Sequence, residues 1–496
     1  MTFEQFKKLA KDFTAIPVYR RLLADTVTPV SLFLKVREEA RYPFLLESVE
    51  GGEHLARYSF LGRNPFRILT YTGGKTTLSE NGHNEALAGN YFDHLRELTT
   101  QYREPKLKDL PSLTGGAVGY SAYDTVRLVE HLPDPPPDDL NLPEAIWCFY
   151  DQIYAFDHVK HQIILIKTVF LDDAAIKGSD ANLKQIYDTA VTSLDNMQAI
   201  TTGEVLSQMP FSLSQEGIDS NTEKSRFMEM VVKAKSCIYE GDIFQVVLSQ
   251  RFRTSYTGDR FMLYRALRMV NPSPYLFYLD FHQFALIGSS PEVLVRVQNG
   301  KAEVLPIAGT RPRGKTEEED LFYENDLRND PKEVAEHIML VDLGRNDLSR
   351  ICKSGTVKLV RNQVIERYSH VMHIVSDVTG QLKDEATSVD ALMYCFPAGT
   401  VSGAPKVRAM EIIDEMEPTK RGPYAGAVGY FDFSGNMDTC IAIRTMVATD
   451  SDIYIQAGAG IVADSVPERE YDETVNKARA LVEALSVALE LNTPAT

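Results

Sequence analysis

The sequence has few cysteines and no long apolar run, and these two shortages exclude several classes of protein. Its five cysteines are widely dispersed in the 496-residue chain, and no two stand in CxxC spacing. An odd, dispersed set fits neither a disulfide framework nor a zinc cluster. No window approaches the roughly 18 consecutive apolar residues of a membrane-spanning helix. The most apolar stretch, Gln162–Leu171, is interrupted by Lys167. We therefore expect reduced thiols and no membrane span.

Positive charge is also scarce. Lysine and arginine total 52 against 69 aspartates and glutamates, which gives a formal net charge of −17. Such a chain repels nucleic acid phosphates and anionic lipid, and no segment gathers a basic stripe. The N-terminal residues MTFEQFKKLAKDF lack the apolar core of a signal peptide. We expect a cytoplasmic protein with no nucleic acid partner and no membrane partner.

The composition is that of a globular protein with more than one folding unit. Hydrophobic residues make up 44 % and charged residues 24 %, and 496 residues allow two or three units. Segment 199–222 is rich in Ser, Thr, Gln and Gly, lacks a hydrophobic period, and contains Pro210. We predict an N-terminal regulatory and partner-binding region over 1–198, a linker over 199–222, and a C-terminal catalytic region over 223–496.

Strand-like and helical segments alternate without the regular βαβ order of a doubly wound fold. Short polar turns such as Asp432–Asn436 favour antiparallel pairing, and the class predicted is α+β. One helix is predicted from the Asp330 cap through about Leu343, and another from a Ser465 cap to about Leu489. The strand-like runs are Phe66–Tyr71, Gln162–Phe170, Phe244–Arg251, Tyr275–Leu279, Val293–Val297, Gly426–Phe433, Ile441–Ala448 and Ile453–Ala457.

Glutamates on the two predicted helices form the first candidate site. Glu336 follows Glu333 by three residues, so both lie on one helix face, and Glu473 precedes Lys477 by four. One interpretation is a solvated face with an ion pair of about 0.3–0.5 kcal/mol. The other is that carboxylates of both helices hold a hard divalent cation, because Mg²⁺ takes one or two protein carboxylates together with water and an anionic ligand.

Glycine-bearing turns and two charged or titratable residues form further candidates. FPAGTVSGAPK (Phe396–Lys406) leads into a helix predicted over about Ala404–Met416 and leaves backbone N–H groups open toward an anion. QAGAGI (Gln456–Ile461) permits close backbone approach.

Arg444 falls in a strand-like run and needs a carboxylate partner, which is either a residue of the chain or a ligand. His373, with His370 nearby, has apolar neighbours and is either a buried structural residue or catalytic.

A set of long segments carries a family resemblance. They are FLLESVEGGEHLARYSFLG (Phe44–Gly62), GDIFQVVLSQRF (Gly241–Phe252), NPSPYLFYLD (Asn271–Asp280), GSSPEVLVR (Gly288–Arg296), PIAGTRPRG (Pro306–Gly314), ENDLRNDPKEVAEHIMLVDLGRNDL (Glu324–Leu348), VMHIVS (Val371–Ser376), FPAGTVSGAPK, GPYAGAVGY (Gly422–Tyr430) and QAGAGIVADSVPEREYDETVNKA (Gln456–Ala478). With these segments the chain resembles the chorismate-utilising enzymes, and nearly end to end it is similar to the component I proteins of anthranilate synthase. The resemblance implies two antiparallel β-sheets packed as a sandwich, with helices outside.

The resemblance also implies a set of site residues. Glu336 and Glu473 would hold Mg²⁺, which binds the ring carboxylate of chorismate. Glu292 would protonate the departing ring hydroxyl, and His373 would serve the later proton removal and pyruvate loss. Thr400 would hydrogen-bond a substrate oxygen, and Lys477 would hold the metal-site carboxylates or the ligand. The residues implied around chorismate are Gly309, Thr310, Tyr424, Arg444, Gly458, Ala459 and Gly460.

Two positions favour ammonia as the nucleophile. Isochorismate-forming relatives carry a lysine base where this chain has Gln245, and neutral ammonia needs no base to attack. Aminodeoxychorismate synthases often carry PIKGT where this chain has PIAGT with Ala308. The implied activity is that of a Mg²⁺-dependent lyase that converts chorismate and ammonia to anthranilate and pyruvate, the first step of tryptophan biosynthesis. Component I of aminodeoxychorismate synthase and a non-catalytic amino-acid-sensing subunit remain alternatives.

The source of ammonia points to a partner. A fused glutaminase would need a nucleophilic cysteine flanked by glycines on a strand–helix turn. The five cysteine contexts, WCF, SCI, ICK, YCF and TCI, have no flanking glycine. We therefore expect a separate glutamine amidotransferase subunit and a hetero-oligomer.

The resemblance further implies feedback inhibition by L-tryptophan. In component I proteins Leu45–Ser48 and Asn271–Tyr275 form a tryptophan pocket away from the active site, and movement between the two halves would transmit the inhibition. The alternative for Leu45–Ser48 is a plain strand end. The implied inhibitor contacts are Ser48, Leu46, Glu47, Pro274, Tyr275 and Leu276.

Overall fold

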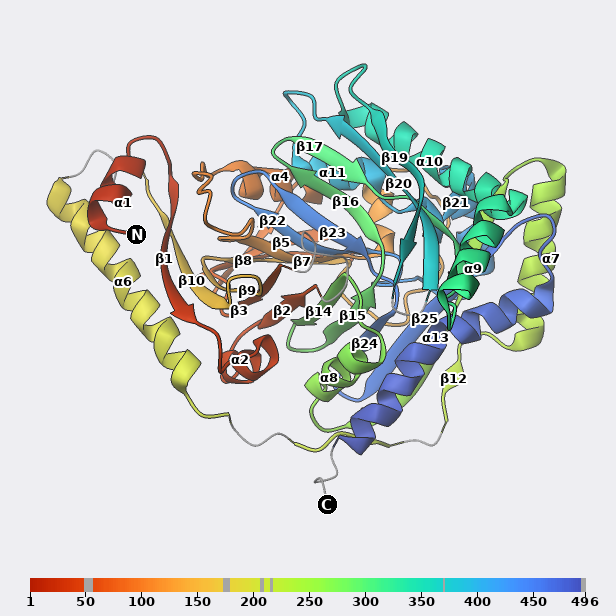
Figure 1. Cartoon of the computed structure of the whole chain (residues 1–496), viewed down its shortest axis with the longest axis horizontal. Helices are drawn as coiled ribbons and strands as arrows, with labels where there is room; N and C mark the ends of the chain where they lie inside the picture. Colours follow the sequence, from red (N-terminus) through yellow and green to blue (C-terminus); the bar gives the residue numbers. More distant parts are fainter. Residues whose placement is uncertain (49–56, 173–178, 206–208, 215–216, 369–370, 492–496) are drawn as a thin grey trace.

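Two large antiparallel sheets face each other and carry helices on their outer faces (Figure 1). We describe the chain from a computed structural model, which covers residues 1–48, 57–172, 179–205, 209–214, 217–368 and 371–491. His370 and part of the segment Phe44–Gly62 lie outside these ranges. The predicted α+β sandwich is confirmed.

The first sheet has 13 strands and joins the N-terminal and C-terminal regions where β2 pairs with β14. Its order is β1 (Ala15–Leu23), β10 (Gln162–Phe170), β9 (Gln152–Asp157), β3 (Tyr58–Gly62), β2 (Phe44–Glu47), β14 (Tyr275–Asp280), β15 (Ala285–Ser290), β24 (Thr445–Ala448), β25 (Asp452–Ile461), β13 (Gln245–Thr257) and β11 (Ser212–Leu213), with β12 (Asp219–Ser220) and β21 (Gly403–Ala404) also paired to β13.

The second sheet has 12 strands and joins the two regions where β7 pairs with β22. Its order is β18 (Ile307–Pro312), β20 (Val371–Gln381), β17 (Lys301–Val304), β16 (Val293–Gln298), β23 (Met437–Ile441), β22 (Ala427–Asp432), β7 (Gly116–Ser121), β8 (Ala145–Tyr150), β4 (Arg67–Thr72), β5 (Lys75–Glu80) and β6 (His83–Leu87), with β19 (Lys358–Arg367) paired to β20.

Alternating side chains along the strands build the core between the sheets. In β14, Phe277 and Leu279 enter the inter-sheet core, whereas Leu276 and Tyr278 pack beneath the helices outside. In β8 the same alternation puts Trp147 on the outer side, where its ring centroid lies 4.8 Å from that of Phe431. Both faces of these strands are buried, and their sequences are accordingly almost wholly apolar.

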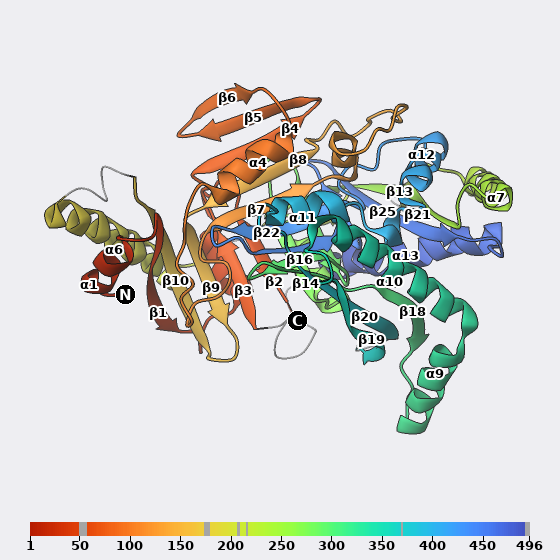
Figure 2. The ribbon, with the colours of Figure 1, turned by 90° about the horizontal axis from the view of Figure 1, so that it is seen from above.

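Helices cover both outer faces. Figure 2 shows α1 and α6 at one end of the molecule and α7 and α12 at the other. None of the helices in the described ranges is both long enough and apolar enough to cross a membrane. The helices are α1 (Phe3–Leu9), α2 (Pro29–Val36), α4 (Tyr91–Thr100), α6 (Asp180–Thr202), α7 (Lys224–Glu240), α8 (Phe261–Val270), α9 (Glu317–Asn329), α10 (Pro331–Ile351), α11 (Ser388–Cys395), α12 (Lys406–Met416) and α13 (Pro467–Glu490), with short 3₁₀ turns η1 (Tyr123–Leu128) and η2 (Gly399–Val401).

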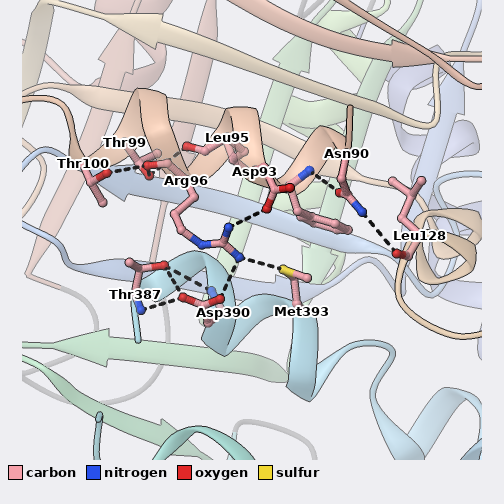
Figure 3. Close-up of polar contacts among 11 residues, drawn as sticks. Asn90, Asp93, Leu95, Arg96, Thr99, Thr100, Leu128, Thr387, Asp390 and Met393 are labelled. Atoms are coloured by element: carbon pink, nitrogen blue, oxygen red, sulfur yellow. Dashed lines mark hydrogen bonds and ion pairs between the residues drawn. The ribbon is translucent and has the colours of Figure 1, made fainter. Parts of the chain in front are cut away.

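A polar junction ties the two regions together outside the sheets (Figure 3). Arg96 of α4 donates to Asp93 at 2.7 Å and to Asp390 of α11 at 2.8 Å, and it also contacts the Met393 sulfur. Within the predicted linker, α6 continues to Thr202, and β11 and β12 pair with β13. Because strands of both regions share both sheets, the predicted division describes the order of the chain rather than separate bodies.

Most predicted elements occur at the expected places, and the differences arise at their ends. The Asp330 carboxylate accepts from the backbone of Lys332 and Glu333 as predicted, and α10 runs on to Ile351. The predicted Ser465 cap is wrong: Val466 precedes α13, and the Ser465 hydroxyl accepts from the amide of Val462. The helix predicted from Ala404 begins at Lys406, because Gly403–Ala404 pairs with β13 instead.

One buried acid makes the stability of this fold depend on pH. Thr114 donates to one carboxyl oxygen of Glu104, and the other oxygen has no hydrogen-bond partner in the described chain. Burial and the neighbouring Asp432 raise the pKa of Glu104 to about 8. The folded chain therefore keeps this group protonated, while the unfolded chain ionises it above its ordinary pKa of 4.5. Stability is lost as the pH rises from about 4.5 to 8.

We predict that Glu104→Gln stabilises the protein at pH 8 and has little effect at pH 4.5. Each pKa unit corresponds to about 1.4 kcal/mol, so the shift from 4.5 to about 8 makes the penalty removed at pH 8 on the order of 5 kcal/mol, or roughly 5 °C in melting temperature for a chain of this size. Thermal unfolding at both pH values, with the exposed Glu97→Gln as control, measures this. Equal effects of Glu104→Gln at the two pH values would contradict the pKa assignment.

Candidate active site

A cavity of about 710 Å³ gathers most of the predicted site residues. They reach it from α10, α13, β13, β18, β20, β25, η2 and the turns between strands, and all belong to the C-terminal region. Because these positions span more than two hundred residues of chain, only the tertiary fold unites them. The predicted residues on its wall are Gln245, Pro274, Glu292, Gly309, Thr310, Glu336, His373, Thr400, Tyr424, Arg444, Gly458, Gly460, Glu473 and Lys477.

One end of the cavity is acidic. Glu333 and Glu336 of α10 and Glu470 and Glu473 of α13 line it together. Lys477 forms the predicted ion pair with Glu473, with Nζ 2.8 Å from Oε1, and it donates to the carbonyl oxygen of Gly458 at 3.0 Å. This lysine thus fastens α13 to β25. Arg311 forms an ion pair with Glu333 at 3.3 Å and Lys332 also lines the cavity, so the four carboxylates exceed these three cations by one charge.

The electrostatics of this end suit a divalent cation. Burial raises the pKa of Glu336, and the neighbouring Glu333 raises it further. Burial and Glu473 likewise raise the pKa of Glu470. In the described part of the chain, no group of three or more acidic, His or Cys side chains is close enough to form a complete metal site. Carboxylates with raised pKa values on two helices are the ligand type of a cation that takes one or two protein carboxylates and its other ligands from water and a bound anion.

Arg444 brings positive charge to the same cavity. The run Ile441–Ala448 is not one strand as predicted, since β23 ends at Ile441 and β24 begins at Thr445. Arg444 lies between them with a positive φ of 51°. Enclosure by protein lowers the pKa of its guanidinium, which Glu292 and Tyr424 partly offset. No hydrogen bond or ion pair engages this side chain in the described chain, so the guanidinium is available to a carboxylate ligand.

His373 is held in a defined orientation on β20. Its Nδ1 lies 2.9 Å from the carbonyl oxygen of Gly309 and 3.1 Å from the Thr310 hydroxyl. Because a carbonyl oxygen only accepts, Nδ1 carries the proton and Nε2 is left with a free lone pair in the neutral ring. Burial lowers the pKa of His373, which favours this neutral form.

Glu292 and Thr400 form a second proton-handling pair. The Thr400 hydroxyl donates to Glu292 Oε2 at 2.9 Å. Enclosure raises the pKa of Glu292, although Thr400, Lys477 and Arg444 each favour its ionised form. A carboxyl group with a raised pKa keeps its proton closer to neutral pH and can act as a general acid.

Glycines in β25 give two side chains room to reach the cavity. A Cβ at Gly458 would lie 2.8 Å from the Tyr424 hydroxyl, and a Cβ at Gly460 would lie 2.7 Å from Gln245 Nε2. Gln245 donates weakly to Glu336 at 3.4 Å, and its Oε1 has no partner in the described chain. Strand alternation turns the methyl group of Ala459 toward the core under α7 and α12, so the contact with chorismate implied by the resemblance stays one of the backbone between the two glycines.

The predicted inhibitor segments meet at the β2–β14 join. Leu46 pairs with Phe277 and Glu47 with Leu276. Asn271–Pro274 lines the same cavity as Arg444, so the expectation that this turn lies away from the active site is wrong. The reason is a short connection: Ser289 donates its amide to the carbonyl oxygen of Arg444 at 3.1 Å, and its hydroxyl bonds Asn271.

The residues predicted to contact the inhibitor do not all face the same side of the sheet. Tyr275 packs toward the inter-sheet core, and its hydroxyl donates to Asp438 at 2.7 Å. Leu276 faces the helices outside, and Glu47 is engaged by Tyr264 and Arg268 of α8. The hydroxyl of Ser48 is enclosed and has no hydrogen-bond partner in the described chain.

Glu333 and Glu470 line the cavity although only Glu336 and Glu473 were predicted as metal ligands. Their signal was present, because both helices carry Glu-x-x-Glu, with the second glutamate of each pair being the predicted ligand. Residues three apart on a helix share a face, so the first glutamate follows the second into the cavity. Val247, Tyr368 and Val371 also line the wall, and no local pattern distinguishes them.

Comparison with known proteins identifies the family. Residues 42–483 match the family of chorismate binding enzymes. The chain is 48 % identical over 491 residues to anthranilate synthase component 1 of Acetivibrio thermocellus, with 99 % of each chain covered. It is 48 % identical over 506 residues to anthranilate synthase component 1 of Synechocystis sp., covering 97 % of this chain and 98 % of that relative. The chain therefore belongs to the chorismate binding enzyme family.

Solved structures agree with this assignment. Anthranilate synthase component I from Streptococcus pneumoniae superposes with a TM-score of 0.72 and 37 % identity, covering 93 % of this chain and 99 % of that one. The menaquinone-specific isochorismate synthase MenF from Escherichia coli reaches a TM-score of 0.69 at 19 % identity, covering 97 % of this chain and 98 % of that one, which shows a shared fold.

We predict that Arg444→Met makes the ligand-free protein more stable and abolishes carboxylate binding. Glu292 and Tyr424 offset the desolvation of the guanidinium only in part, so its removal gains on the order of 1 kcal/mol. Calorimetric titration with benzoate, a minimal aromatic carboxylate, should show at least a tenfold loss of affinity. Arg345→Met on the exposed side of α10 is the control. A destabilised Arg444→Met that still binds benzoate would contradict the assignment.

Proposed function

We propose that the cavity binds chorismate and converts it with ammonia to anthranilate and pyruvate, in a Mg²⁺-dependent lyase reaction in the cytoplasm. The observation that carries the proposal is the convergence of the carboxylates of α10 and α13 on the cavity that also holds Arg444, Glu292 and His373. High identity to anthranilate synthase component 1 proteins over nearly the whole chain supports the same activity.

Glu336 and Glu473 are the residues proposed to hold Mg²⁺, with water and the ring carboxylate of chorismate as further ligands. When bound, the ion would neutralise that carboxylate and stabilise negative charge in the ring. Lys477 keeps Glu473 in place through their ion pair. Arg444 is free to bind the other carboxylate of the substrate, which would fix chorismate between the two ends of the cavity.

In the first stage, a bond forms between the ammonia nitrogen and the ring carbon next to the carboxylate-bearing carbon, while the ring hydroxyl leaves as water. Glu292, with its raised pKa, supplies the proton to the hydroxyl. Thr400 holds the Glu292 carboxyl and places it toward the ring. Gln245 offers an unpaired amide oxygen but no base, which suits neutral ammonia.

In the second stage, the ring loses a proton and the bond to the enolpyruvyl oxygen breaks, which releases pyruvate and leaves the aromatic ring. His373 is the proposed base. Its Nδ1–H is fixed by the Gly309 carbonyl, and its pKa is lowered, so Nε2 can accept the proton near neutral pH. Aromatisation makes the step favourable.

We propose that a separate glutamine amidotransferase subunit supplies the ammonia. The relatives are named component 1, which implies a second component. All five cysteines are free thiols without the glycine-flanked context of a glutaminase nucleophile.

The experiment that tests the function uses the purified chain with chorismate, Mg²⁺ and a nitrogen source. We expect ammonium to give the fluorescence of anthranilate, and glutamine to give none until the partner subunit is added. Chromatography of the product separates the ortho amine from the para amine. A product with the amino group para to the carboxylate would assign the aminodeoxychorismate reaction instead. Absence of any turnover with ammonium would refute the enzymatic proposal.

The metal assignment predicts a specific effect of Glu336→Gln. Replacing one of two proposed carboxylate ligands should raise the Mg²⁺ concentration for half-maximal activity at least tenfold. Titration of activity with Mg²⁺ measures this, and Glu318→Gln on the exposed face of α9 serves as control. An unchanged Mg²⁺ dependence with reduced activity would remove Glu336 from the metal site.

We further propose that L-tryptophan inhibits the enzyme at the β2–β14 join. The enclosed, unpaired Ser48 hydroxyl lies there and can hydrogen-bond the amino-acid head group. The side chains of Glu47 and Leu276 face the outer helices and are engaged there. At these two positions, therefore, only the backbone would be available to tryptophan. The Asn271 turn lies at this join and reaches Arg444 through Ser289, which gives inhibitor and substrate a shared structural element.

Ser48→Phe should abolish inhibition by tryptophan while leaving the KM for chorismate within about twofold, because the bulky ring fills the space of the head group. Initial rates over a range of tryptophan concentrations test this, with Ser349→Phe on the exposed side of α10 for comparison. Inhibition of Ser48→Phe at wild-type tryptophan concentrations would place the inhibitor elsewhere.

A further inference from the structure

A fully buried arginine lies directly behind the cavity wall. Arg421 is 2 % exposed and does not itself line the cavity. Its Nε donates to Glu417 Oε2 at 2.9 Å, and its Nη2 donates to Glu417 Oε1 at 2.6 Å. Its remaining donors reach the backbone carbonyl oxygens of Val401 and Val247, each at 2.6 Å.

The acceptors of Arg421 belong to segments that form the wall. Val247 of β13 and Val401 of η2 both line the cavity. Val401 follows Thr400 directly, so the bond to the Val401 carbonyl fixes the backbone from which the Thr400 hydroxyl reaches Glu292.

The flat faces of the guanidinium contact two tyrosine rings, and one of these tyrosines, Tyr424, lines the cavity. The central carbon of the guanidinium lies 4.7 Å from the ring centroid of Tyr123 and 5.6 Å from that of Tyr424. Tyr424 lines the cavity, and its hydroxyl occupies the space left by the absent side chain of Gly458. The guanidinium therefore contacts backbone behind Thr400 with its edge and Tyr424 with its face.

Glu417 anchors the arginine to the sheet. Its Oε1 accepts from both the amide and the hydroxyl of Ser249 in β13, each at 2.8 Å. A buried ion pair is not needed for stability as such, because replacing it by apolar residues of similar volume often leaves a protein equally stable. A planar fork with five fixed donors, in contrast, can set two carbonyl groups and a carboxylate at defined positions at once, which an ammonium group cannot.

We propose that Arg421, clamped by Glu417, is a positioning residue for the reaction: it sets Thr400 relative to Glu292 through the backbone that it holds. This inference rests on the proposed function of the cavity. It is distinct from that proposal because Arg421 touches neither substrate nor metal and acts only through the residues it holds.

A double-mutant cycle on the ammonium-dependent reaction tests the proposal. Arg421→Lys keeps the charge but loses the fork, and we expect kcat/KM for chorismate to fall about 10- to 100-fold, as a displacement of about 1 Å can cause. If Arg421 acts through Thr400, the double variant with Thr400→Ala should lie within about threefold of Thr400→Ala alone. Multiplied losses in the double variant would overturn the proposal.

Arg37→Lys is the matched control. Arg37 also makes two hydrogen bonds to one carboxylate, Asp259, at 2.9 and 2.5 Å, and its guanidinium carbon lies 5.0 Å from the ring centroid of Phe261. None of these three residues lines the cavity. We expect Arg37→Lys to lower the melting temperature comparably and to leave kcat/KM within about twofold. A loss of activity equal to that of Arg421→Lys would make both effects merely structural and overturn the inference.

Glu417→Gln provides a second cycle that keeps Arg421 in place. The amide retains the shape and one acceptor, so the variant tests the orientation of the arginine even where Arg421→Lys does not fold. We expect a loss about threefold to tenfold that is again absent in the Thr400→Ala background. Lack of turnover by the wild-type chain would refute the proposed function, whereas an active wild type with independent losses in both cycles would refute only the positioning role.

Discussion

The site depends on an unbalanced distribution of charge across one cavity. Glutamates of α10 and α13 line it with raised pKa values at Glu336 and Glu470, and the Arg444 guanidinium, which has no hydrogen bond in the described chain, lines it too. Each arrangement is unfavourable in the absence of a ligand, because like charges repel and enclosed charges lose hydration. Under the proposed function, a bound cation and a dicarboxylate would compensate both together.

The two sheets supply the rigidity that this arrangement requires. β25 pairs with β13 over ten residue pairs, and its glycines open the space into which Tyr424 and Gln245 project. Arg444, in contrast, lies on an irregular connection held by the end of β15, and the same strand end holds the Asn271 turn through Ser289. The paired strands of this wall thus accompany a guanidinium on an irregular connection, and that connection is tied to the Asn271 turn at the join between the two regions.

Family motifs in the sequence predicted most of the cavity wall, because Glu336, Glu473 and His373 each stand in a matching segment. Local rules predicted the Asp330 cap and the Glu473–Lys477 pair, which depend only on helical spacing. Sequence periodicity misplaced Arg444 within one strand, since the left-handed residue that separates β23 from β24 is set by tertiary pairing. The role inferred for Arg421 needed coordinates, because its acceptors are backbone carbonyls far away in the chain.

The most direct test of the account is anomalous diffraction at the manganese edge from crystals of the chain soaked with Mn²⁺ and a chorismate analogue. The account predicts one peak in contact with carboxylate oxygens of both Glu336 and Glu473 and with the carboxylate of the ligand. A peak that touches only one of the two helices, or a ligand bound with no metal in this cavity, would contradict it.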